Sequence, residues 1–424
     1  MGEIIHKMCA GVKLPKMVKI RQVFDRPFVE DIAAETLCQL SQDKIAKTIQ
    51  PGMSIAITAG SRGIRNIALI TKTIVDFVKS RGAVPFIVPA MGSHGGACAE
   101  GQTEVLHDFG ITESYCGCPI KSSMETVKVG ETEEGHPVYV DKNAYEADGI
   151  IVSCRIKPHT SFRGQYESGI MKMMTIGLGK HKGAETCHAI GTEDMSKYVE
   201  MFANVIRKNA KILFGVASIE NAYDETCKII ALTNDEIPVE EPALLEYAKK
   251  NMPRILVGDE GEVLIIDTIG KNLAGTGHDP NISGRFGTSP LRGGFENQRL
   301  VCLDLSDETH GNAVGMGLAD VVVKRLVDKC DHEKGYANLI TSMAPEAYKI
   351  PMTADCDADA IKLAVKTCIG VAEEDVRVVR VGNTLHVEEI WISENMLKAA
   401  KAHSQIEILS LPCEFAFDEN GNLF

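Results

Sequence analysis

Basic side chains follow three separate apolar segments in the first half of the chain. Arg62 and Arg65 follow "MSIAIT", His94 follows "AVPFIVP", and His159 follows "DGIIVSCRI". Histidine can transfer protons near neutral pH, and arginine can hold a carboxylate through two parallel hydrogen bonds. If these loops converge, they could bind a small carboxylate substrate and exchange protons with it.

Each of these residues also has an ordinary interpretation. A single loop histidine is more often solvated than catalytic, and the two arginines are equally compatible with solvated loop charges or phosphate contacts at a helix start. The shared position of His94 and His159 at strand ends favours a functional role for both. The segment "GLGKHKG" (177–183) is similar to a phosphate loop but lacks the Walker spacing, and its basic residues at 180–182 have no assigned role.

Strands that alternate with helices must position these side chains. A helical pattern follows the first strand, and apolar, β-branched runs predict strands at 53–58, 83–89, 148–156 and 212–220. This alternation is typical of an α/β fold with a mostly parallel sheet. Ligands of such sheets bind outside the carboxyl ends of the strands, where the three basic loops are expected.

The pattern changes near residue 254 and continues into a second α/β set. A strand is expected at 299–305, helices at about 313–328 and 358–368, and two paired strands after them. We therefore predict two α/β domains, residues 1–265 with a mostly parallel sheet and a smaller domain of residues 266–424. The active site is expected in the cleft between them.

A Gly-rich segment, residues 270–294, lies between these two sets of elements. It is either a structured inter-domain connection or a binding loop, and both interpretations stay open. As a binding loop it would offer the side chains of Lys271, His278, Asp279 and Asn281.

Composition excludes several functional classes. A net charge of −13 argues against a nucleic-acid partner and requires a local basic pocket for any anionic ligand. No apolar run is long enough to span a membrane, and the first residues lack the apolar core of a signal peptide. The thirteen dispersed cysteines indicate reduced thiols. We expect a cytoplasmic enzyme that acts on a small molecule and has no membrane partner. The sequence does not specify the oligomeric state, and a homo-oligomer is possible.

The loop set resembles the lactate racemase family of nickel-dependent 2-hydroxyacid racemases and epimerases. The resemblance lies between about residues 55 and 188 and rests on "SRGIR", "GSH", "KPHTSFRG", "SGIMKMMTIG" and "ETCH". Arg62 and His94 are 32 residues apart, and Lys172 and His188 are 16 apart, both close to the family's separations.

The resemblance implies an isomerase that depends on a nickel-pincer nucleotide. Lys172 takes the place of the lysine that tethers this cofactor, and His188 takes the place of the nickel ligand. Separate enzymes build the cofactor, so cofactor biosynthesis enzymes are implied partners, and a preparation made without them would be apoprotein.

The resemblance also implies roles for the basic loops. His94 and His159 correspond to the acid/base pair, and Arg62 to the arginine that orients the substrate carboxylate, with Arg65 as the competing candidate. Hydride would leave the hydroxyl-bearing carbon for the cofactor and return on the other face. The segment "TIG" replaces the family's Pro-Gly, and the lysines near 357–367 lack the expected glutamine, so the substrate is expected to differ from lactate.

Two other functions stay open from the sequence. The same fold could act as a dehydrogenase or dehydratase on a hydroxy acid, or as a non-catalytic protein that binds a metabolite.

Overall fold

The computed structural model describes residues 3–61, 63–191, 194–287, 291–342 and 344–424. The chain forms two compact units: one comprises Arg26–Met252, and the other joins Met1–Asp25 to Pro253–Phe424. Both units are mixed α/β with large, mostly parallel sheets; the sequence predicts two α/β domains and a mostly parallel sheet in the N-terminal one. Within the described ranges, every helix is too short or too polar to cross a membrane.

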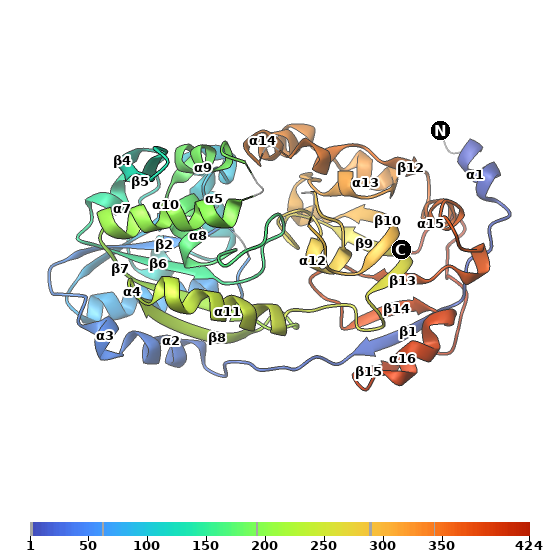
Figure 1. The fold of residues 1–424 in the computed structure, drawn as a ribbon, viewed down its shortest axis with the longest axis horizontal. Helices are drawn as coiled ribbons and strands as arrows, with labels where there is room; N and C mark the ends of the chain where they lie inside the picture. The colour runs from blue at the N-terminus through green and yellow to red at the C-terminus, as the bar shows by residue number, and fades with distance from the viewer. Residues whose placement is uncertain (1–2, 62, 192–193, 288–290, 343) are drawn as a thin grey trace. The chain divides into compact units, whose positions relative to one another are not determined.

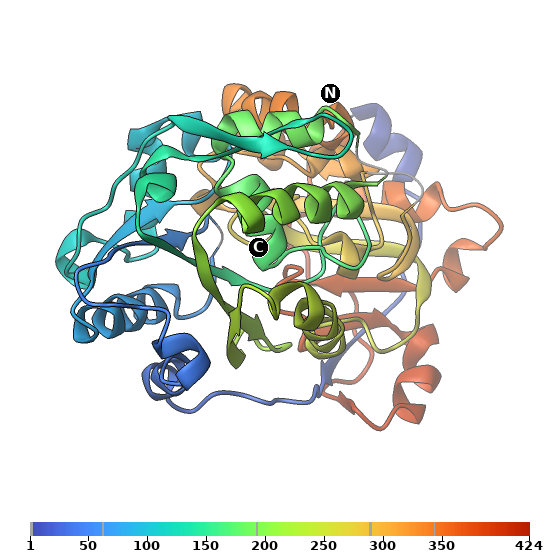
Figure 2. The same cartoon turned by 60° about the vertical axis from the view of Figure 1, so that its left-hand side comes forward.

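The unit of residues 26–252 is built on a sheet with strand order β3-β2-β6-β7-β8. The first four of these strands are parallel to one another, and β8 is antiparallel to β7. A two-stranded hairpin, β4-β5, lies beside helices α9 and α10 (Figure 2). The strands are β2 Ser54–Ala59, β3 Val84–Pro89, β4 Thr126–Glu131, β5 Pro137–Asp141, β6 Gly149–Arg155, β7 Ile212–Glu220 and β8 Thr226–Thr233.

Helices cover both faces of this sheet (Figure 1). Ile55 and Ile57 of β2 pack with α2 and α4, whereas Ala56 faces the opposite core, which contains α8, α10 and α11. Strands buried on both faces are apolar throughout, which makes them recognisable in the sequence. The helices are α2 Ile32–Leu40, α3 Asp43–Ala46, α4 Ile67–Ser80, α5 Ala99–Asp108, α6 Glu113–Cys116, α7 Lys142–Glu146, α8 Ile170–Lys172, α9 Lys180–His188, α10 Met195–Asn209 and α11 Ile237–Asn251, with a 3-10 turn η1 Gly95–Ala97 and a π-helical turn η2 Met173–Gly177.

The three basic loops leave neighbouring strands of this sheet. β2 pairs in parallel with β3 on one side and with β6 on the other. The carboxyl ends of these strands therefore lie at the same edge, so the three predicted strands are neighbours, which is the condition for their loops to converge.

The second unit contains a sheet in the order β12-β11-β10-β9-β13-β14-β1-β15. The first five strands in this order, from β12 to β13, are parallel to one another. The next three, β14, β1 and β15, are each antiparallel to the strand before them. The strands are β1 Met17–Gln22, β9 Glu260–Ile269, β10 Glu296–Leu305, β11 Val321–Val323, β12 Met352–Ala354, β13 Val378–Val381, β14 Glu389–Ser393 and β15 Ile406–Ile408. The helices are α1 Glu3–Cys9, α12 Pro280–Ser283, α13 Lys324–Asp328, α14 His332–Ser342, α15 Asp357–Lys366 and α16 Leu397–Ala402, with 3-10 turns η3 Asp307–Thr309, η4 Met316–Leu318, η5 Pro345–Tyr348, η6 Glu373–Asp375 and η7 Glu394–Met396.

The division into units differs from the expected boundary at residue 265. That position lies inside β9, and residues 1–25 join the second unit because β1 pairs with β14 and β15. The expected helix at 313–328 is also wrong over Val321–Val323, which form strand β11 beside β10. Three consecutive β-branched valines favour the extended conformation there.

The Gly-rich loop lies within the second unit, so it is not a connection between the units. His278 is fully buried, and its Nδ1 lies 2.9 Å from Ser283 Oγ. The Asp279 side chain accepts the backbone N–H of Asn281 and caps α12. The Lys271 ammonium donates to the Gly275 carbonyl within the same loop. These contacts stabilise the fold of the loop itself.

Candidate active site

The loops after β2 and β3 are joined by a hydrogen bond between Ser61 Oγ and His94 Nδ1. Both side chains are half-buried. A hydroxyl can donate or accept, so this contact is compatible with either neutral tautomer of His94. If Nδ1 donates to Ser61, then Nε2 is a proton acceptor. Arg62 follows Ser61 and lies outside the described residues.

Arg65 is exposed, and its backbone is fixed to the ends of two strands. Its N–H donates to Glu220 Oε1 at 2.8 Å, and its carbonyl accepts from Thr226 Oγ1 at 3.3 Å. The other oxygen of Glu220 is paired with the guanidinium of Arg155, and both of these side chains are largely buried. Arg155 therefore already has a carboxylate partner, whereas the Arg65 side chain is exposed.

His159 lies on the loop after β6, where its backbone and ring are both held. Its N–H donates to Glu167 Oε2 at 2.7 Å, and its ring stacks on Phe162 with the centroids 4.1 Å apart. The backbone N–H of Ser161 donates to His159 Nδ1 at 3.1 Å. Since a backbone N–H can only donate, Nδ1 is unprotonated in this geometry, and neutral His159 carries its proton on Nε2.

Glu167 is a residue that the sequence did not single out. Its side chain is fully buried and lies 3.1 Å from Lys249 Nζ and 3.5 Å from Arg163 Nη1. Arg163 also donates to the carbonyl of His159. A fully buried carboxylate needs such cationic partners, and it fixes the His159 backbone at the same time. Its partner Lys249 is on α11, so sequence spacing gave no signal for it.

Lys172 is half-buried at the end of α8, a three-residue helix. The buried carboxylate of Glu241 accepts the backbone N–H of Met171 at 3.1 Å and caps the start of this helix. Burial raises the pKa of Glu241 to about 7, although the backbone N–H groups of Met171 and Ile170 oppose that rise. A π-helical turn follows Lys172 directly, a rare conformation that is frequent at functional sites.

The His94 loop packs directly against this π-helical turn. The N–H of Gly92 donates to the carbonyl of Gly177 at 3.3 Å. A Cβ added at Gly177 would lie 2.7 Å from the carbonyl oxygen of Ala90, and one added at Gly60 would lie 3.1 Å from Met173 Cε. The structure therefore brings the loops after β2 and β3 against the segment that begins at Lys172.

His188 is half-buried at the last position of α9, whereas Lys172 ends α8, and the π-helical turn η2 and a left-handed residue, Lys180, lie between them. Among the described residues, no group of three or more His, Cys, Asp or Glu side chains is arranged to bind a metal ion. One imidazole, of His188, and one primary amine, of Lys172, are the donor types required by a nickel group that brings its own donor atoms and is attached through lysine. The residues present are therefore compatible with the cofactor that the resemblance implies.

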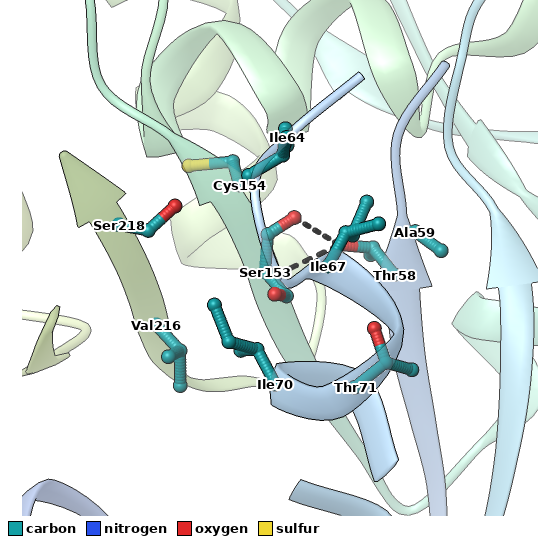
Figure 3. Close-up of a pocket in the computed structure, with 10 residues that line it drawn as sticks. All are labelled: Thr58, Ala59, Ile64, Ile67, Ile70, Thr71, Ser153, Cys154, Val216 and Ser218. Atoms are coloured by element: carbon teal, nitrogen blue, oxygen red, sulfur yellow. Dashed lines mark hydrogen bonds between the residues drawn. The ribbon is translucent and has the colours of Figure 1, made fainter. Parts of the chain in front are cut away.

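A small pocket lies near the ends of β2, β6 and β7, under the first turns of α4 (Figure 3). The Thr58 hydroxyl bridges to β6 there, since it accepts from Ser153 N–H at 2.9 Å and donates to Ser153 O at 3.2 Å. Of the site residues expected from the sequence that the structure describes, none lines this pocket. The lining residues are Thr58, Ala59, Ile64, Ile67, Ile70, Thr71, Ser153, Cys154, Val216 and Ser218.

We compared the chain with known protein families and solved structures. Residues 16–215 match the family model of the lactate racemase N-terminal domain. This match covers a little under half of the chain, and it shows that this region is similar to the N-terminal domain of lactate racemases. The matched region contains His94, His159, Lys172 and His188.

One solved structure shares the fold of this chain. The lactate racemase apoprotein from Thermoanaerobacterium thermosaccharolyticum is 10% identical with a TM-score of 0.50, over 87% of this chain and 98% of that chain. A structural genomics target from Thermotoga maritima is 13% identical with a TM-score of 0.49, over 77% of this chain and 83% of that chain. No curated protein matches the chain.

Proposed function

We propose that this protein racemises or epimerises a 2-hydroxy acid, with a nickel-pincer nucleotide attached to Lys172. The match of residues 16–215 to the lactate racemase N-terminal domain supports a racemase-type function. The observation that carries the proposal is the contact between Gly92 and Gly177, which packs the His94 loop against the turn after Lys172. A proton-transfer group and a candidate tether thereby come from two elements that pack together.

Lys172 and His188 are the residues that would hold the cofactor, through an amine and an imidazole. When bound, the nickel-pincer nucleotide supplies the hydride acceptor and donor of the reaction. The buried carboxylate of Glu241 fixes the start of α8 and so limits the positions of the Lys172 backbone. Lys172 and His188 are proposed for these roles from the family resemblance, and both lie within the region that matches the lactate racemase N-terminal domain.

The two histidines are proposed to move the hydroxyl proton of the substrate. His94, with Nδ1 donating to Ser61, can accept that proton at Nε2. Neutral His159 presents an N–H at Nε2, because Nδ1 accepts from Ser161, and can donate to the substrate oxygen. Arg65 and Arg62 are the proposed partners of the substrate carboxylate.

The test uses protein co-produced with the cofactor biosynthesis enzymes. Intact mass and nickel content are measured for the parent and for Lys172→Ala, with Lys182→Ala as a control at an exposed position on α9. We expect the adduct to be lost only in Lys172→Ala. If the parent carries neither adduct nor nickel, the cofactor assignment is wrong.

The reaction is followed with α-deuterated 2-hydroxy acids and sugar acids. Inverted configuration with retained deuterium in the product supports racemisation or epimerisation. Formation of a keto acid or an alkene supports a dehydrogenase or dehydratase instead. Binding without turnover, unchanged in His94→Ala and His159→Ala, supports a non-catalytic binding protein.

A further inference from the structure

Lys180 occupies an unfavourable position at the start of α9. Its side chain is fully buried, and its backbone is left-handed, with φ of 54°. Non-glycine residues rarely adopt this conformation, and burial disfavours the charged ammonium. Burial accordingly lowers the pKa of Lys180, while the negative charge of Asp141 opposes the shift. Contacts around the side chain must compensate for both features.

The Lys180 ammonium has three oxygen neighbours from separate elements. Nζ donates to the carbonyl of Pro89 at 2.8 Å and to Gln102 Oε1 at 2.7 Å, and Asp141 Oδ2 lies 3.5 Å away. Pro89 is the last residue of β3, directly before the His94 loop. Because an ammonium has donors only, it requires the Gln102 amide to present its oxygen.

That orientation turns the Gln102 amide nitrogen toward the His94 loop. Nε2 donates to the carbonyl of Gly92 at 2.9 Å and to that of His94 at 3.2 Å. Gln102 is fully buried, so water does not replace these donors. One amide thus holds the backbone on two sides of Ser93, and its orientation depends on Lys180.

Asp141, the third oxygen neighbour of Lys180, is itself held by contacts with α7 and with the segment before α9. Its Oδ1 accepts the N–H of Ala144 at the start of α7, and its own N–H donates to the carbonyl of Leu178 at 2.7 Å. The carboxylate is fully buried, so its position is fixed by these contacts. Asp141, Lys180 and Gln102 form a buried relay from the segment before α9 to the His94 loop.

We propose that Lys180, acting through Gln102, is a positioning residue that holds the His94 loop for proton transfer. The catalytic meaning of this role rests on the proposed function, whereas the structural link to the loop does not. A buried hydrophobic residue would fill the same space without the cost of desolvating a charge, so a specific orienting role accounts for a lysine here.

Hydrogen exchange of the apoprotein tests the link without any cofactor. Gln102→Glu keeps the size of the side chain and its contact with Lys180, but a carboxylate cannot donate to the loop carbonyls. We expect exchange in residues 91–98 to rise about tenfold in Gln102→Glu and in Lys180→Met, as expected for lost hydrogen bonds. Lys182→Met, at an exposed position on α9, should leave it unchanged.

Kinetics of the loaded enzyme test the catalytic meaning. We expect kcat to fall by roughly 10- to 100-fold in both variants with little change in KM, because misplacement of a reacting group affects the chemical step. If folded variants are only less stable, with unchanged exchange at 91–98, the relay is refuted. If exchange rises but a fully loaded parent has no activity, the structural link stands, and the proposed function and the catalytic meaning of the relay are refuted.

Discussion

The buried carboxylate of Glu241 makes the stability of the Lys172 segment depend on pH. Burial raises the pKa of Glu241 from 4.5 to about 7. The folded protein therefore holds this proton more tightly than the unfolded chain does. The resulting stabilisation is fully present below about pH 4.5 and is lost as the pH rises through about 7. Glu241→Gln is neutral at every pH and lacks this dependence.

The size of the effect follows from the two pKa values. The full difference corresponds to about 3 kcal/mol, at about 1.4 kcal/mol for each pH unit between the two values. Between about pH 6 and pH 8 the parent should lose about 1.4 kcal/mol relative to Glu241→Gln. At the isoelectric point of about pH 5.5 the low net charge would favour precipitation, and the range from pH 6 to pH 8 lies above it.

Hydrogen exchange of residues 170–178 measures this loss locally. Protection factors, corrected for the intrinsic effect of pH on exchange, are compared for the parent and Glu241→Gln at the two pH values. The ratio of protection between variant and parent should change about tenfold. Glu246→Gln is the matched control, because Glu246 lies on the same helix with an exposed side chain.

A ratio that stays constant between the two pH values would refute the reasoning. Glu241 would then titrate in the folded protein as it does in the unfolded chain. A change of the same size in Glu246→Gln would point to a general effect of pH on α11.

Buried and crowded positions elsewhere give further outcomes. Burial lowers the pKa of His278 from 6.5 to about 4. As the pH drops, His278 therefore gains its proton in the unfolded chain before it does so in the folded protein. The free energy of unfolding should fall by up to about 3 kcal/mol between those two pH values. Urea unfolding followed by the fluorescence of the single tryptophan measures this, and the same pH dependence in His278→Gln would contradict it. Gly177→Ala places a Cβ 2.7 Å from a backbone oxygen and should lower the free energy of unfolding by at least about 2 kcal/mol. The control Gly135→Ala has open space around the added Cβ but a φ of 84°, and it should lower the free energy of unfolding by about 1 kcal/mol. Equal losses in urea unfolding would argue against this packing. Glu167→Gln should lower kcat of the loaded enzyme about tenfold, because it weakens the charge-assisted bond to the His159 N–H. An unchanged kcat would mean that this bond does not position His159.

Local pattern predicted the strands that carry the candidate site. The runs that form β2, β3, β6 and β7 are apolar because helices cover both faces of their sheet. Their alternation with helices predicted a parallel sheet, and their loops therefore share one edge. The Ser61–His94 contact joins two of these loops, those after β2 and β3.

The sequence did not predict which distant segments pair. β1 joins β14 and β15 across more than three hundred residues, so the N-terminal segment belongs with the C-terminal half. Val321–Val323 form a strand because β10 and β12 lie on either side. Strand pairing depends on hydrogen bonds to another segment, and periodicity within one segment does not specify the partner.

The sequence by itself determined the fold class, the resemblance to lactate racemases and the order of the basic loops, because short apolar runs, glycines and motif spacing are local properties. Only the tertiary structure decided which charged groups are buried and what holds each loop. Lys180, Glu167 and Glu241 are ordinary polar residues in the sequence, and each is buried by contacts with elements far along the chain. Burial of a charge and the orientation of a hydrogen bond depend on those contacts, so they are properties of the packed chain.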